Sequence, residues 1–256
     1  MEGRTRATAG PSIFLFPGWI RGELRSSLAG QPPAARGSCR WAEGPGYNLR
    51  MFTSTITAAT WNEIERVGRL VAERDDAWAI PRVSAEFLHA LVLAGGYRRG
   101  LEIGTSYGYS ALWIGAALAH NGGLLTTIEM NAAKAALSRE AFRRAGLAQT
   151  LTVVHGRAED VVGGLEGPFD FVFLDAEKAG TRGYFDLVYP KLAHRATIVT
   201  DNVSSHAAEL TEFVAHIRAH PRFCSVLLPV GSGLEVSVKL DPFAMTVTVD
   251  GADWVI

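Results

Sequence analysis

Hydrophobic positions follow two different spacings along the chain from residue 55 onward. Apolar residues recur three and four positions apart over residues 64–71 and again over 87–92, and Gly95 and Gly96 follow the second set. This spacing is typical of amphipathic helices, which glycines often end. Two helices are therefore predicted before the first strand.

Short apolar runs then alternate with amphipathic segments. The runs are typical of buried strands and lie at 100–103, 124–128, 151–154, 169–174 and 196–199. The other segments predict helices near 109–119, 132–145, 158–165, 181–192 and 206–219. Strands joined by helices of this length form right-handed crossovers. The sequence therefore predicts an α/β fold, a Rossmann-like doubly wound sheet of five parallel strands with helices on both faces.

The last two apolar segments differ in how they are connected. Only "GSG", residues 231–233, separates "CSVLLPV" from "LEVSVKL". A parallel crossover needs a dozen residues or more, so these segments predict a C-terminal antiparallel hairpin at one edge of the sheet.

The first fifty residues follow neither spacing. They hold eight Gly, five Pro and seven Arg against three acidic residues. We therefore expect residues 1–50 to be a disordered N-terminal extension or a mis-assigned start ahead of Met51. An Arg-rich transit peptide is an alternative, whereas Pro17 and Gly18 interrupt the apolar piece and disfavour a secretory signal. Residues 51–256 are expected to form a single domain.

Charge and composition narrow the classes of partner. The net charge is −1, and once the first fifty residues are set aside, 18 of the 25 basic and 23 of the 26 acidic residues remain. An acidic domain disfavours nucleic acid and anionic membranes as partners. No apolar run approaches the roughly 20 residues that span a bilayer. Only Cys39 and Cys224 occur, which fits a reducing compartment, and a cytoplasmic location is expected.

The ends of the first predicted strands carry candidate contacts for a nucleoside. In "LEIGTSYGYS", Glu102 and Gly104 lie at the strand end and Gly108 opens the next helix. The stretch lacks the middle glycine of G-x-G-x-x-G, so it favours a compact ligand over a pyrophosphate. Glu129 ends the second strand, where an acid can accept hydrogen bonds from two ribose hydroxyls. NAD-binding folds have an acid at the same place, so Glu129 indicates a nucleoside without saying which one. The backbone at Ala158 lies where an adenine edge would rest.

Oxygen-bearing side chains follow the fourth and fifth predicted strands. Asp175 comes after "FVFL", and Asp201 and Asn202 come after "TIVT". Neighbouring parallel strands end at the same edge of a sheet, so these side chains are expected to converge. Two carboxylates and an amide suit a hard divalent cation such as Mg²⁺, Ca²⁺ or Mn²⁺. The structural alternative is that all three residues only form turns.

Together these motifs resemble the cation-dependent O-methyltransferases typified by the caffeoyl-CoA and catechol enzymes, within the class I S-adenosylmethionine-dependent superfamily. The resemblance covers residues 80–240 and rests on "EFLHALVLAGG", "LEIGTSYGYSALWIGAAL", "TTIEMN", "FDFVFLDAEK", "IVTDNV" and "LLPVGSGLEVSVK". It implies S-adenosylmethionine as cofactor, a homodimer, and metal ligands at Asp175, Asp201 and Asn202. The implied cofactor contacts are Glu102, Gly104, Thr105, Ser110, Glu129, Ala158 and Asp175.

Lys178 is the candidate catalytic residue, three positions after Asp175. A phenol has a pKa near ~10, so little phenolate exists at neutral pH unless a cation lowers that pKa. Lys178 is placed to take the hydroxyl proton or to stabilise the phenolate; a solvated lysine at a helix start is the alternative. The predicted function is methyl transfer to a hydroxyl of a small catechol-like or phenolic acceptor.

Two departures from the family pattern bear on the substrate. "AGTRGYF" delays the first aromatic residue after the lysine to Tyr184, and "VSSHAAEL" replaces the Leu-Trp-Gly-like loop of relatives that act on coenzyme A esters. A small phenol is therefore favoured over such an ester, and His206 either lines the acceptor pocket or begins a helix. An NAD(P)-linked oxidoreductase and a non-catalytic nucleoside-binding protein remain the alternative functions.

Overall fold

Seven strands form one sheet in the computed structural model, which describes residues 54–240, 246–249 and 252–255. In spatial order the strands are β3 (Leu151–His155), β2 (Leu124–Glu129), β1 (Arg99–Ile103), β4 (Phe169–Leu174), β5 (Leu192–Thr200), β7 (Leu234–Lys239) and β6 (Phe223–Leu228). The first five run parallel, and β7 is antiparallel to β5 and β6. The predicted five parallel strands and C-terminal antiparallel hairpin are confirmed.

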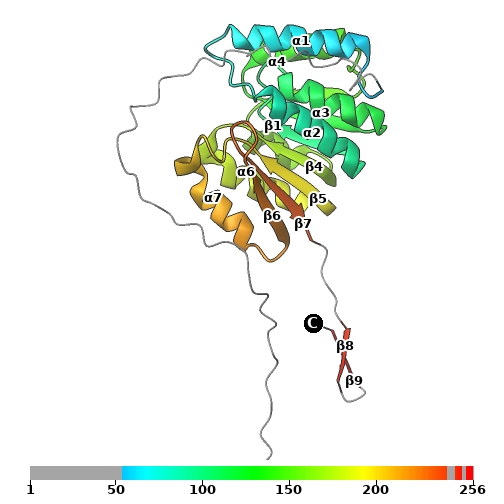
Figure 1. The fold of residues 1–256 in the computed structure, drawn as a ribbon, viewed down its shortest axis with the longest axis vertical. Coiled ribbons are helices and arrows are strands. Elements are labelled where there is room, and N and C mark those ends of the chain that lie inside the picture. Colours follow the sequence, from blue (N-terminus) through cyan, green and yellow to red (C-terminus); the bar gives the residue numbers. More distant parts are fainter. Residues whose placement is uncertain (1–53, 241–245, 250–251, 256) are drawn as a thin grey trace, which may run out of the picture. The chain divides into compact units, whose positions relative to one another are not determined.

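Helices cover both faces of this sheet (Figure 1). One face carries α1 (Ala58–Ala72), α2 (Arg82–Gly95), α3 (Tyr109–His120) and α4 (Ala132–Arg144), and the other carries α5 (Ala158–Val161), α6 (Thr181–Val188) and α7 (Ala207–Ala219). Alternate residues of β4 divide between the two cores: Phe171 and Phe173 pack with the first set of helices, Val172 and Leu174 with the second. This alternation explains why the strand reads as an unbroken apolar run.

Local signals set several helix ends. The Asn131 side chain accepts hydrogen bonds from the backbone N–H groups of Ala133 and Lys134 and so caps the start of α4. Gly96 ends α2 in the left-handed conformation, with a φ of 62°. The predicted glycine stop after the second helix is thus confirmed.

The segment predicted as one helix over 181–192 is shorter and changes conformation. Helix α6 ends at Val188, a 3₁₀ turn covers Tyr189–Lys191, and β5 begins at Leu192, four residues before the predicted start. Pro190 lies within the turn and lacks the N–H group that a continued helix needs. Similarly, the helix predicted over 158–165 is the short α5 followed by a 3₁₀ turn over Val162–Gly164.

A second antiparallel pair, β8 (Thr246–Val249) and β9 (Ala252–Val255), was not predicted. The Asp-Gly pair between these strands is a frequent hairpin turn and could have revealed it. The predictions for residues 1–50 and for a start at Met51 lie outside the described residues, so the proposed domain boundary stays a prediction. Within the described ranges, no helix is long and apolar enough to cross a bilayer.

Candidate active site

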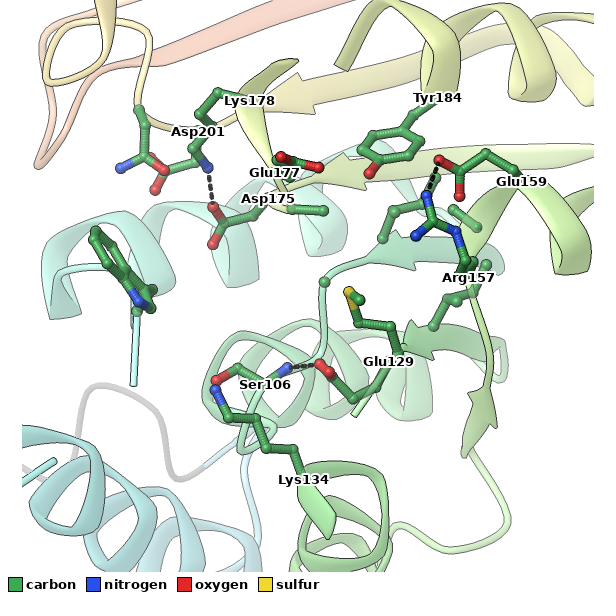
Figure 2. Close-up of a pocket in the computed structure, with 18 of the residues that line it drawn as sticks. Ser106, Glu129, Lys134, Arg157, Glu159, Asp175, Glu177, Lys178, Tyr184 and Asp201 are labelled. Atoms are coloured by element: carbon green, nitrogen blue, oxygen red, sulfur yellow. Dashed lines mark hydrogen bonds and ion pairs between the residues drawn. The ribbon is translucent and has the colours of Figure 1, made fainter. Parts of the chain in front are cut away.

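A cavity of about 650 Å³ opens at the carboxyl ends of the parallel strands. Gly104 after β1, Glu129 at the end of β2, Asp175 after β4 and Asp201 after β5 all line it. Figure 2 shows Glu129 on one side of the cavity and Asp175 with Asp201 on the other. Open parallel sheets bind ligands at this edge, so the cavity is the candidate site.

Glu129 is held in place by two backbone N–H groups. Its Oε2 accepts a hydrogen bond of 2.7 Å from Ser106, and its Oε1 accepts one of 2.8 Å from Asn131. Ser106 has a φ of 48°, a left-handed conformation within the turn that joins β1 to α3. Each carboxylate oxygen retains acceptor capacity, so Glu129 can also accept hydrogen bonds from ligand hydroxyls.

Gly104 allows the ends of β1 and β4 to approach closely. Its φ is 106°, and a Cβ atom at this position would lie 2.2 Å from the carbonyl oxygen of Asp175. Any other residue would therefore be strained and would also clash with backbone. This constraint explains why a glycine is needed at the strand end, and the cofactor contact at Gly104 stays a prediction.

Three predicted cofactor contacts form a hydrogen-bonded group at the wall of the cavity. Glu102 is fully buried and accepts hydrogen bonds from Ser110 Oγ at 2.6 Å and Thr127 Oγ1 at 2.5 Å. Thr105 Oγ1 lies 2.5 Å from Thr127 Oγ1. Thr105 and Ser110 line a small recess beside the main cavity. Glu102 lies behind these hydroxyls, so its direct contact with a ligand stays a prediction.

Burial raises the pKa of the Glu102 carboxyl group to about 7, although the Ser110 and Thr127 hydrogen bonds oppose this rise. The group is therefore close to half-ionised at neutral pH. A ligand with a cationic amino group nearby would favour its charged form.

Asp175 and Asp201 occupy equivalent positions just past two neighbouring strands. The backbone N–H of Asp175 donates to the carbonyl of Ile103 at 3.0 Å, and that of Asp201 donates to the carbonyl of Leu174 at 3.1 Å. These bonds continue the parallel ladders by one residue. Asp201 Oδ1 also accepts a hydrogen bond of 2.6 Å from Ser232 Oγ, in the turn before β7. The expected convergence of the two aspartates is thus explained by strand register.

Both aspartates are costly to ionise without a positive partner. Desolvation raises the pKa of Asp175 to about 7; the nearby Lys178 lowers it, and the charge of Asp201 raises it. Desolvation likewise raises the pKa of Asp201. Two desolvated carboxylates that open onto the same cavity form a suitable oxygen set for a divalent cation.

Lys178 and Asn202 complete the predicted group. Lys178 Nζ lies 2.9 Å from Asp175 Oδ1 and donates a hydrogen bond to it. Asn202 lines the cavity with a φ of 66°, and its Nδ2 donates to Ser205 Oγ at 3.2 Å, leaving the amide oxygen as a potential ligand. The described residues contain no cluster of three or more His, Cys, Asp or Glu suited to a metal. The predicted set instead has two carboxylates and an amide.

Other residues line the cavity but were not predicted as site residues. They include Trp78, Ala79, Ser106, Met130, Lys134, Arg157, Glu159 and Glu209. Ser106 lies within a recognised motif and could have been found there, whereas Trp78 comes from the loop between α1 and α2 and has no local signal. His206 precedes α7 and also lines the cavity, and its contact with an acceptor stays a prediction.

The chain shares sequence with known methyltransferases. Residues 101–203 match the family model described as a methyltransferase domain. A catechol O-methyltransferase of Mycobacterium tuberculosis is 37% identical over 143 residues, which are 54% of this chain and 64% of that protein. A catechol O-methyltransferase of Niastella koreensis is 34% identical over 131 residues, 50% and 59% of the two chains. The chain thus spans less than two thirds of the length of these relatives.

A solved structure extends the likeness over nearly a whole protein. The O-methyltransferase of Bacillus cereus in complex with S-adenosylhomocysteine (SAH) aligns with a TM-score of 0.63 and 27% identity, over 74% of this chain and 96% of that one. The chain is thus similar in sequence and in fold to class I O-methyltransferases. The segment matched by the family model, 101–203, contains Glu129, Asp175 and Asp201, and so residues from both sides of the cavity.

Proposed function

We propose that this protein transfers a methyl group from S-adenosylmethionine to a hydroxyl of a small catechol-like or phenolic acceptor, with the help of a divalent cation, Mg²⁺ being the expected ion. The observation that carries the proposal is that a single cavity is lined by Glu129 on one side and by Asp175 and Asp201 on the other. The names of two relatives and the SAH-bound neighbour support the choice of reaction.

Glu129 and its neighbours would bind the cofactor. S-Adenosylmethionine supplies an electrophilic methyl group on a sulfonium centre. Glu129 would accept hydrogen bonds from its ribose hydroxyls, and Ala158, which lines the cavity at the start of α5, would lie against the adenine. Ser110 and Thr105 line the adjacent recess, where hydroxyl groups can hydrogen-bond the amino-acid end of the cofactor.

Asp175, Asp201 and Asn202 would hold the cation. Their oxygen donors and the raised pKa values of the two carboxyl groups fit a hard positive ion at this position. A divalent cation bound there lowers the pKa of a coordinated hydroxyl and so favours the nucleophilic oxyanion. Lys178 would either stabilise the negative charge on the acceptor oxygen with its ammonium group or, once neutral, accept the hydroxyl proton at Nζ.

A methylation assay tests the proposal. The protein is incubated with S-adenosylmethionine and a panel of catechols and phenols, first with Mg²⁺ and then with excess EDTA. We expect methylated product with Mg²⁺, loss of product in EDTA and recovery when Mg²⁺ is restored. Unchanged methylation in EDTA would contradict the role of the cation.

The same assay separates the alternatives. SAH binding without turnover on the whole panel would favour a non-catalytic nucleoside-binding protein. Tight NAD binding without SAH binding would favour an oxidoreductase, which Glu129 alone does not exclude. The similarity to O-methyltransferases supports methyl transfer over both.

We propose that the protein forms a homodimer, as the resemblance implies, and that it acts in the cytoplasm, as its two cysteines suggest. Light scattering during gel filtration measures the mass of the particle directly, and a monomer at micromolar concentration would contradict the first proposal.

A further inference from the structure

Two residues of the domain body, Tyr107 and Lys134, hold the loop between α1 and α2, residues 73–81, through contacts to Asp76. Tyr107 OH donates a hydrogen bond of 2.8 Å to Asp76 Oδ2, and Arg74 Nε lies 2.8 Å from Asp76 Oδ1. Lys134 Nζ donates to the backbone carbonyl of Asp76 at 2.6 Å. We call Arg74, Asp76, Tyr107 and Lys134 the Asp76 clasp. It joins the loop to the turn before α3 and to the first turn of α4.

The Tyr107 ring is the fixed point of this clasp. Its side chain is almost completely buried, with the residue 3% exposed. The Arg74 guanidinium lies 5.0 Å and the Lys134 ammonium 5.2 Å from the ring centroid, within the range of cation–π attraction. The Asp76 carboxylate offsets one of these two positive charges, since it lies 2.8 Å from Arg74 Nε and 3.9 Å from Lys134 Nζ. The loop is thus bound both by its backbone and by its side chains.

The loop carries part of the cavity wall. Trp78 and Ala79 both line the cavity, and the Trp78 ring lies 6.4 Å from the ring of His206, which precedes α7. Helix α7 belongs to the opposite helical layer from α1 and α2, so this contact joins elements from the two faces of the sheet at the cavity wall. Lys134 also lines the cavity. The clasp therefore meets the cavity wall through Lys134 and through the loop that carries Trp78.

Trp78 is 76% exposed although it is a large apolar side chain. Exposed aromatic surface at the rim of a cavity is typical of a ligand contact, because covering it removes apolar area from water. Trp78 lies beside His206 and near the Asp175–Asp201 pair, where the acceptor is proposed to bind.

We propose that the Asp76 clasp positions Trp78 at the acceptor end of the cavity, so that Asp76 and Tyr107 control acceptor affinity without touching the acceptor. Asp76 and Tyr107 are positioning residues, and Trp78 is the residue that they hold in place to contact the acceptor. The proposal concerning the loop stands on its own; its consequence for acceptor affinity rests on the proposed function.

Two variants test the clasp. Tyr107→Phe keeps the buried ring and removes only the hydrogen bond to Asp76. Asp76→Ala removes both carboxylate contacts on a side chain that is half exposed, so it leaves the core intact. Asp76→Asn is the conservative variant, because its amide oxygen can still accept from Tyr107.

Two matched controls lie away from the cavity. Tyr97→Phe removes a tyrosine hydroxyl that bonds Thr197 Oγ1 within the sheet. Glu140→Gln removes a carboxylate that, like Asp76, pairs with arginines, here Arg143 and Arg144 on α4.

The first readout is amide hydrogen exchange of residues 73–81 in the ligand-free protein. We expect exchange at least fivefold faster in Tyr107→Phe and Asp76→Ala, an intermediate rate in Asp76→Asn, and wild-type rates in both controls. Unchanged exchange in this loop, or equally faster exchange throughout the domain, would overturn the proposal. This readout does not depend on catalysis, so it holds even if the proposed methyl transfer fails.

The second readout is steady-state kinetics with an acceptor from the methylation panel. We expect the acceptor KM to rise about fivefold to tenfold in Tyr107→Phe and Asp76→Ala, with kcat at saturating acceptor and SAH affinity within twofold of wild type. Partial recovery of KM in Asp76→Asn is expected. A loss of kcat with unchanged KM would contradict a positioning role for the clasp.

Discussion

The ammonium group of Lys178 lies 2.9 Å from Oδ1 of Asp175, and both side chains are largely buried, at 14% and 10% exposure. The lysine follows β4 in the 3₁₀ turn Lys178–Gly180, so the same strand end supplies the carboxylate and its positive partner. The proposed cation ligand and the proposed catalytic group are therefore directly coupled.

Replacing Lys178 tests this coupling. Lys178→Met should lower kcat about 10²-fold or more, because a positioned acid–base or charged group typically contributes 10²–10⁴-fold. Lys178→Arg keeps a positive charge on a guanidinium group that stays protonated. If Lys178→Arg is active and Lys178→Met is not, the residue acts by stabilising negative charge rather than by removing the proton. The measurement is kcat across the pH range with SAH affinity as control. Full kcat in Lys178→Met at every pH would remove the residue from the chemistry.

Asp201→Asn should weaken cation binding and stabilise the metal-free protein. The substitution removes one of two desolvated carboxylates, so Mg²⁺ affinity should fall at least about tenfold, as titration calorimetry would measure. Because the charge of Asp201 raises the pKa of Asp175, its removal should also lower that pKa and raise the thermal midpoint without metal. The control is Asp160→Asn, an exposed carboxylate on α5. Equal Mg²⁺ affinity in both variants would exclude Asp201 as a ligand.

Gly104→Ala should damage both stability and cofactor binding. The new Cβ would meet the Asp175 carbonyl oxygen at 2.2 Å, in a backbone conformation with a φ of 106°. We expect a loss of at least ~2 kcal/mol in unfolding free energy and a marked loss of SAH affinity. Gly163→Ala is the matched control, since nothing lies within 4 Å of its added Cβ. A denaturant titration in which both variants behave alike would show that Gly104 is not constrained.

Glu102 should make stability fall as pH rises. Its pKa is about 7 in the folded protein against a usual value of 4.5, so the folded state binds the proton more tightly and loses stability between these pH values. The effect is on the order of 3 kcal/mol in total. Glu102→Gln should therefore gain stability relative to wild type between pH 4.5 and pH 8. If the difference in unfolding free energy between Glu102→Gln and wild type stayed constant over this pH range, the raised pKa of the buried Glu102 carboxyl group would be contradicted.

The sequence was sufficient for most of the fold because hydrophobic spacing follows burial. The runs at 124–128 and 169–174 match β2 and β4 to within one residue, since both strands are buried on two faces. The predicted start of β5, residue 196, is four residues too late. The first four residues of the strand, "LAHR" at 192–195, include only one buried residue, Leu192, and so they give no apolar run. The spacing of hydrophobic residues cannot detect an exposed strand segment that is defined mainly by its hydrogen bonds to the neighbouring strand.

The candidate site was predictable where it depends on strand ends. Asp175, Asp201 and Glu129 each follow or end a parallel strand, so topology alone brings them to one edge. Trp78 and Lys134 reach the cavity from a loop and from α4, and their approach depends on how the helices pack. Glu102 illustrates a third case: its position at the site was predicted, but its enclosure by Ser110 and Thr127 hydroxyls follows from side-chain packing.

Calorimetric titration with SAH and, separately, with NAD tests the central claim most directly, because it needs no knowledge of the acceptor. We predict saturable SAH binding to one site per chain and no measurable NAD binding. Glu129→Gln should lose SAH affinity by about tenfold or more, because the substituted amide lacks one of the acceptor oxygens, whereas Glu140→Gln on α4, away from the cavity, should not. Saturable NAD binding with no SAH binding would contradict the account.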